Sequence, residues 1–180
     1  MLFCVLGKGV TVMDIKRSAY PETKLYNFIM KEFDKRGVTK DDIVDIAIQL
    51  QAKYNPDVPR EDYFKVLEVI LHKIAVMNSL AVGLTLDNLA TEKKLPEPLQ
   101  TIIQEDSSYF DIDEYLAISI SNLYGAIGIT NFGFLDKCKS GIVKQLDESK
   151  DRVNTFADDL VGALAVAVGA KVSFDNHIGF

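Results

Sequence analysis

The feature that most constrains the fold is an uninterrupted apolar run, LVGALAVAVGA, at residues 160–170. It is shorter than the roughly 20 residues that a membrane-spanning helix needs, and so is the other long run, residues 74–86, which Asn78 and Ser79 interrupt. Glycine costs up to about 1 kcal/mol in a helix, so the small residues of this run predict close approach of a neighbouring backbone. Small residues also recur at 125–128, and we expect both segments to form central, tightly packed helices.

Most of the remaining chain repeats apolar residues with the spacing of an amphipathic helix, and no segment alternates with the period of a strand. Helices are predicted at 21–36, 41–54 (capped by Thr39), 59 to a bend at Gly83, 84–92, 96–105, 115–130 (capped by Asp111) and 155–171, with 131–151 irregular apart from one short helix. The pattern predicts an all-α, compact multi-helix bundle in which a central helix is surrounded by about five others. Residues 1–20 are predicted to be an N-terminal extension, 21–171 a single helical domain and 172–180 a C-terminal tail.

Charge and cysteine content limit the classes of partner and compartment. The net charge of -6 opposes a phosphate backbone, and no basic stripe with aromatic residues occurs, so nucleic acid is not an expected partner. The two cysteines form no CxxC pair and no disulfide framework, which favours a cytoplasmic protein. We expect no transmembrane segment, although a location peripheral to the membrane and a homo-oligomeric state are both compatible with this composition.

The polar residues that could carry chemistry are carboxylates in the C-terminal half of the chain. They are Asp113, Glu114, Asp136, Asp147, Asp158 and Asp159, with lysines at 137 and 139. Magnesium accepts a few carboxylate oxygens and needs no histidine, and it can neutralise a phosphate oxygen and activate water. A lysine would add a second positive contact to phosphate. The alternative for two of these acids is helix capping, because Glu114 follows Asp111 and Asp158 follows Thr155 at capping-box spacing.

The chain also resembles a known family in a series of short motifs that occur in order. They are RGVTKDDI at 36–43, YNPD at 54–57, LPEPL at 95–99, DE at 113–114, YG at 124–125, TNFG at 130–133, LDK at 135–137 and FADDL at 156–160. This set resembles the phosphatidylglycerophosphatase A family, in its low-temperature-requirement C branch. The resemblance covers roughly residues 36–171.

The resemblance implies an all-α fold and a magnesium-dependent phosphatase, with Mn²⁺ as a substitute ion. It assigns Glu114, Asp136, Asp158 and Asp159 to the metal and gives supporting roles in catalysis to Asp113 and Asp147, with Lys139 contacting phosphate. The expected substrate is phosphatidylglycerophosphate or a related phosphorylated compound, presented as a small molecule or a lipid head group. The alternative is a non-catalytic helical scaffold or metal-binding protein linked to cold or stress adaptation. Ser140-Gly141 favours it, because the membrane-bound enzymes have Pro-Trp-Pro there.

Overall fold

The computed structural model describes residues 20–178, and within that range it contains helices and no strand. The helices are α1 (Glu22–Lys35), α2 (Lys40–Gln51), α3 (Arg60–Leu71), α4 (Ile74–Thr91), α5 (Leu99–Gln104), α6 (Ile112–Ser121), the short 3₁₀ helix η1 (Asn122–Tyr124), α7 (Ala126–Lys137), α8 (Gly141–Asp147) and α9 (Ala157–Ile178). The all-α prediction is confirmed. The predicted N-terminal extension, apart from residue 20, lies outside the described residues.

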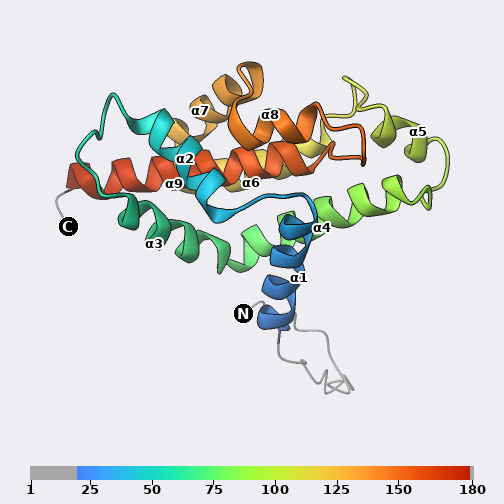
Figure 1. The fold of residues 1–180 in the computed structure, drawn as a ribbon, viewed down its shortest axis with the longest axis horizontal. Helices are drawn as coiled ribbons and strands as arrows, with labels where there is room; N and C mark the ends of the chain where they lie inside the picture. Colours follow the sequence, from blue (N-terminus) through green and yellow to red (C-terminus); the bar gives the residue numbers. More distant parts are fainter. Residues whose placement is uncertain (1–19, 179–180) are drawn as a thin grey trace, which may run out of the picture.

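Helix α9 is the centre of the molecule. It runs along the long axis of the fold in Figure 1 and packs against α2, α3, α4, α6, α7 and α8. Every residue from 154 to 170 is buried, as expected for a helix that is apolar on all sides. A Cβ on Gly162 would lie 3.4 Å from Leu135, and a Cβ on Gly169 would lie 3.2 Å from Gln51. The predicted close packing around this helix is therefore present.

The second helix expected at the centre, around residues 125–128, packs closely on a neighbouring backbone at Gly128, where a Cβ would lie 1.9 Å from the carbonyl oxygen of Ser121, but it lies at the surface rather than at the centre. Helix α7 packs on α9 through Phe132 and Leu135, while Ile127, Ile129 and Phe134 are exposed. The predicted 115–130 helix is also divided, because Gly125 adopts φ +82° between η1 and α7. The 131–151 segment, predicted to be mostly irregular, holds the rest of α7 and the short helix α8.

The break in the third predicted helix falls at His72-Lys73 rather than at Gly83, which lies inside α4. A Cβ on Gly83 would lie 2.6 Å from Leu160 Cδ1 and 2.9 Å from Phe156 Cβ. This glycine therefore serves contact between α4 and α9, and bends neither helix. Within the described range, α4 is the one helix whose length and composition would suit a membrane span; in the fold 44% of it is buried, packed against α1, α6 and α9.

Two helix ends can be compared with their predicted positions. Thr39 caps α2 as predicted, since its hydroxyl accepts the N–H of Asp42 at 3.2 Å. Helix α9 continues beyond its predicted end at Lys171, through the region predicted as a tail, as far as Ile178. Its N-terminus lies inside the bundle, near the start of α6.

Candidate functional site

The buried N-terminus of α9 places Asp158 and Asp159 in its first turn, where the helix dipole favours negative charge. The alternative explanation for Asp158, capping by Thr155, is not what the structure shows. The Thr155 hydroxyl donates to the carbonyl oxygen of Ile103 at 2.7 Å. Asp87, a fully buried residue of α4, accepts the N–H groups of Phe156 and Ala157 at 3.1 and 2.9 Å. The carboxylate of one helix therefore caps the other, and Asp158 is left free to face the site.

Asp113 and Glu114 stand in the first turn of α6, and the predicted capping box before them does not form. Asp111 adopts a left-handed conformation with φ +52° and makes no side-chain hydrogen bond to the helix end. The helix begins at Ile112, three positions earlier than predicted. Capping by Asp111 thus does not account for Glu114, and the two acids are available for another role.

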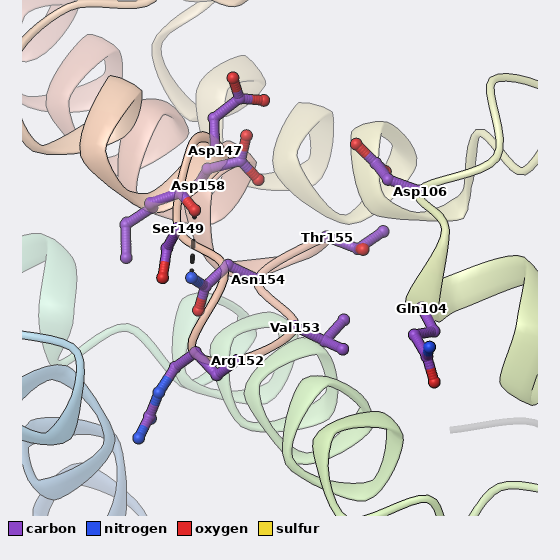
Figure 2. A pocket seen from close by; sticks show the side chains of 10 residues that line it. Gln104, Asp106, Asp147, Ser149, Arg152, Val153, Asn154, Thr155 and Asp158 are labelled. Carbon is purple, nitrogen blue, oxygen red and sulfur yellow. Dashed lines mark hydrogen bonds between the residues drawn. The ribbon is translucent and has the colours of Figure 1, made fainter.

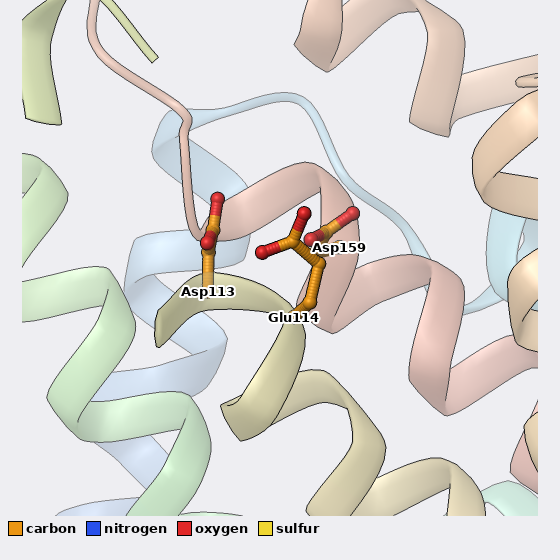
Figure 3. Close-up of side chains that lie close together, drawn as sticks. All are labelled: Asp113, Glu114 and Asp159. Atoms are coloured by element: carbon orange, nitrogen blue, oxygen red, sulfur yellow. The ribbon is translucent and has the colours of Figure 1, made fainter. Parts of the chain in front are cut away.

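Three carboxylates from α6 and α9 converge on one point. Asp113, Glu114 and Asp159 each offer an oxygen, and these atoms all lie within 4.8 Å of one another. Figure 3 shows the three side chains facing one another across the gap between the two helices. Asp113 and Asp159 are each only 6% exposed. An adjacent pair on α6 and a residue of α9 at least 45 positions later therefore form one compact acidic cluster.

The other predicted residues lie beside this cluster. Lys139 follows α7, and its ammonium group donates to Asp147 of α8 at 2.6 Å and to Asp158 at 2.7 Å. A hollow of about 180 Å³ is lined by Asp113, Glu114, Asp136, Lys139, Asp158 and Asp159, together with Asp106, Ser107, Ser108 and Thr155. Asp147 lines the adjoining hollow. The structure thus brings all seven predicted side chains into one region, while their roles stay predictions.

Burial and mutual repulsion disfavour full ionisation of the cluster. Burial raises the pKa of Asp159 to about 9, and the nearby charges of Asp158 and Asp113 add to the effect. The pKa of Asp113 rises to about 8, first by burial and then by the adjacent Glu114. Burial raises the pKa of Asp158 to about 6 against the opposing charge of Lys139. For Lys139, Asp158 and Asp147 outweigh burial and hold its pKa above the usual value, so it stays cationic.

The donor set fits a hard divalent cation. Asp113 Oδ1 and Glu114 Oε2 are buried and have no hydrogen-bond partner within residues 20–178. Buried polar atoms almost always have partners, so two unpaired oxygens on neighbouring carboxylates indicate a position that a cation would satisfy. Two ligands on opposite sides of an octahedral Mg²⁺ ion, at 2.0–2.1 Å each, lie about 4 Å apart. That spacing is compatible with the 4.8 Å limit of the cluster.

Two residues of the site were missed by sequence reasoning. Asp87 sits on the buried face of an apolar helix, one turn after Gly83, and that isolation of an acid among apolar residues was a usable signal. Asp106 follows α5 with φ +49° and lines both the 180 Å³ hollow and its neighbour. Burial raises the pKa of Asp106. Its place in a connecting loop gave no signal in the sequence.

Comparison with known proteins assigns the family. Residues 37–174 match the model of the phosphatidylglycerophosphatase A family. The chain is 44% identical over 158 residues to the uncharacterized protein YpjQ of Bacillus subtilis, covering 88% of this chain and 89% of that protein. The crystal structure of YpjQ superposes with a TM-score of 0.83 at 42% identity, over 88% of this chain and 99% of that one.

A second solved structure extends the likeness. The low temperature requirement C protein of Listeria monocytogenes gives a TM-score of 0.82 at 38% identity, over 87% of this chain and 99% of that one. The matched region contains every residue of the acidic cluster. The chain therefore belongs to the phosphatidylglycerophosphatase A family, in the branch that includes the low temperature requirement C protein.

Proposed function

We propose that this protein is a magnesium-dependent phosphatase that hydrolyses a phosphomonoester, with Mn²⁺ able to replace Mg²⁺. The observation that carries the proposal is the convergence of Asp113, Glu114 and Asp159 around two buried carboxylate oxygens without partners. Membership of the phosphatidylglycerophosphatase A family supports a phosphorylated substrate. Phosphatidylglycerophosphate and related soluble or lipid-borne phosphomonoesters are the proposed substrates, acted on in the cytoplasm or at the membrane surface.

Each side chain has a proposed role. Asp113, Glu114 and Asp159, whose oxygens lie within 4.8 Å of one another, would hold the metal. Asp136 and Asp158 line the same hollow and are its further candidate ligands. Bound there, Mg²⁺ supplies positive charge to a phosphate oxygen and lowers the pKa of water.

Lys139 and its acidic partners act at the edge of the same hollow. The ammonium group stays protonated and holds Asp158 and Asp147 in place. Its third N–H is the proposed contact to phosphate. The walls from α6 and α9 bury the reacting groups, which strengthens each of these electrostatic contacts.

The test is phosphate release from a panel of phosphomonoesters, including phosphatidylglycerophosphate in detergent micelles, with Mg²⁺, with Mn²⁺ and with EDTA. We expect release to require the metal. In Asp159→Ala it should fall about a hundredfold or more, as when an electrostatic stabiliser is removed. Glu105→Gln is the matched control, because this exposed acid lies near the site but lines neither hollow. Wild-type release by a folded Asp159→Ala protein would refute the assignment.

A metal-binding helical protein without catalytic activity is the second candidate, and the pairing of Lys139 favours it. The ammonium group expected to contact phosphate is already shared between two carboxylates. Calorimetric titration with Mg²⁺ separates the two functions. Binding that Asp159→Ala abolishes, without phosphate release from any member of the panel, would support the second candidate and exclude the first.

A further inference from the structure

The 180 Å³ hollow at the acidic cluster is the first of three neighbouring hollows. It shares Asp106, Thr155 and Asp158 with a second hollow of about 100 Å³. The second hollow in turn shares Leu146, Ser149, Arg152 and Asn154 with a third of about 310 Å³. The shared residues place the three hollows next to one another, and we call this row, from the acidic cluster to the side chains of Lys35, Arg36 and Arg152, the trough.

The far end of this trough differs in charge from the end at the acidic cluster. Lys35, Arg36 and Arg152 line it together with a single carboxylate, Asp151. The cations Lys35 and Arg36 already pair with the buried Glu32, at 2.6 and 2.9 Å. Burial would raise the pKa of Glu32, but its bonds to Lys35, Asn88 and Arg36 hold that pKa at about 2, so this acid stays ionised.

Arg152 is the cation at this end that has no such partner. Its guanidinium group makes no ion pair and no hydrogen bond with any side chain or backbone group of residues 20–178. Figure 2 shows its side chain extending away from Asp147 and Asp158. Arg152 also lines the third hollow. A guanidinium group offers a planar fork of N–H donors that matches a phosphate or a carboxylate.

Two buried polar atoms also lack partners along the trough. Arg36 Nε is an unpaired donor on a side chain that is 0% exposed, although both terminal nitrogens of Arg36 are bonded to Glu32 and Asn88. Asn154 Oδ1 is likewise unpaired, while its amide nitrogen donates to the carbonyl oxygen of Leu146 at 3.1 Å. Unpaired buried polar groups are uncommon in native proteins, and here both belong to residues that line the same hollow.

We propose that the trough binds a substrate that carries a second anionic group besides its phosphomonoester, with Arg152 as the principal contact of that second group. The inference rests on the proposed function, since the phosphomonoester is placed at the acidic cluster. Lys35 and Arg36 add positive potential at the same end. The second group is a phosphate or carboxylate of a soluble compound, or the phosphodiester of a lipid head group.

Two matched series of probes test this. Bisphosphates of straight-chain α,ω-diols and monophosphates of alcohols of the same length are compared as substrates at fixed free Mg²⁺. Phosphonate analogues of both series, which cannot be hydrolysed, are compared by calorimetry. We expect the bis-anionic member to be preferred about tenfold at the chain length that matches the trough, in line with one charge-assisted hydrogen-bond contact. Arg152→Gln should remove this preference and Arg152→Glu should reverse it.

Lys150→Gln is the matched control, because Lys150 is an exposed cation in the same loop that does not line the trough. It should keep the native selectivity in both assays. Equal binding of mono- and bisphosphonates, or a preference that survives Arg152→Gln, overturns the inference even if phosphate release is observed. Absence of hydrolysis with an Arg152-dependent preference for bisphosphonates overturns the proposed phosphatase function and leaves the inference standing. A preference confined to phosphatidylglycerophosphate micelles assigns the second anion to a lipid.

Discussion

Replacing Asp87 tests whether one carboxylate holds the buried end of α9 in place. Phe156 and Ala157 donate their N–H groups to it at 3.1 and 2.9 Å, and both residues are 0% exposed. In Asp87→Ala neither N–H has an acceptor, and each unsatisfied buried donor costs about 1–3 kcal/mol. We therefore expect the metal-free variant to lose about 2–4 kcal/mol of unfolding free energy at pH 5.

The size of this loss should depend on pH, because burial raises the pKa of Asp87 to about 7 despite the opposing N–H groups and Arg36. Between the unfolded value of 3.8 and pH 7, the folded protein holds a proton on Asp87 that the unfolded chain releases. The stability that Asp87 contributes is thus fully present below its unfolded pKa and is lost as pH rises toward 7. The difference between native protein and Asp87→Ala should shrink by about 1.4 kcal/mol per pH unit over that interval.

The assay is urea unfolding in EDTA at pH 5, 6 and 7, with free energies from linear extrapolation. Thr39→Ala is the matched control, since Thr39 caps α2 at the surface and its loss should cost about 1 kcal/mol at all three pH values. Asp87→Asn keeps one acceptor without a charge and should lie between the native protein and Asp87→Ala at pH 5. A negligible loss in Asp87→Ala at pH 5, or a loss that grows with pH, would refute the reasoning.

Two further predictions concern packing and charge. Gly83→Ala should destabilise by about 1–3 kcal/mol in thermal or urea unfolding, because its Cβ would lie 2.6 Å from a leucine of α9. Gly133→Ala, whose Cβ would meet nothing within 4 Å, should instead stabilise the protein by up to about 1 kcal/mol through helix propensity. A change in unfolding free energy of the same sign in both variants would contradict this packing. The metal-free protein should lose stability from pH 5 to pH 9, because the raised pKa values of Asp113 (about 8) and Asp159 (about 9) favour the folded state only while these acids are protonated. Melting in EDTA across this range checks it, and a midpoint that rises with pH would count against it.

Most helices could be predicted from the sequence because caps and the spacing of apolar residues involve only neighbouring positions. The Thr39 cap and the apolar spacing of α1 and α2 depend on residues a few positions apart, and both appear in the structure. The errors arose where a distant contact decides the conformation. Gly83 was read as a break from its sequence neighbours alone, yet its neighbour in space is α9. The glycines of α7 led us to predict a central helix. Its position at the surface depends on contacts with distant segments, which the glycines do not reveal.

The acids of the candidate site were easier to predict from the sequence than Asp87, the residue that caps α9 beneath them. Six acids stood out because they lie in polar motifs, and the family resemblance grouped them before any contact was known. Asp87 lies in an apolar helix, and its partner, the first turn of α9, is about 70 residues away in the sequence. The role of such a buried acid depends on which backbone N–H groups lie opposite it in space. A single sequence does not reveal that arrangement.

The N-terminus of α9 therefore needs a buried acceptor for its N–H groups and also holds several acids that repel one another. Its burial demands an internal acceptor for the first N–H groups, and Asp87 supplies it at the cost of a buried carboxylate. Its first turn also carries Asp158 and Asp159 near Asp113 of α6, and burial, together with repulsion from neighbouring carboxylates, raises the pKa of all three. One lysine, Lys139, offsets only part of this charge. Protons relieve the repulsion in the metal-free protein, and a bound dication would relieve it without them. Mg²⁺ should accordingly bind more tightly as pH rises from 6 to 9, with release of protons that calorimetry in buffers of different ionisation enthalpy would detect.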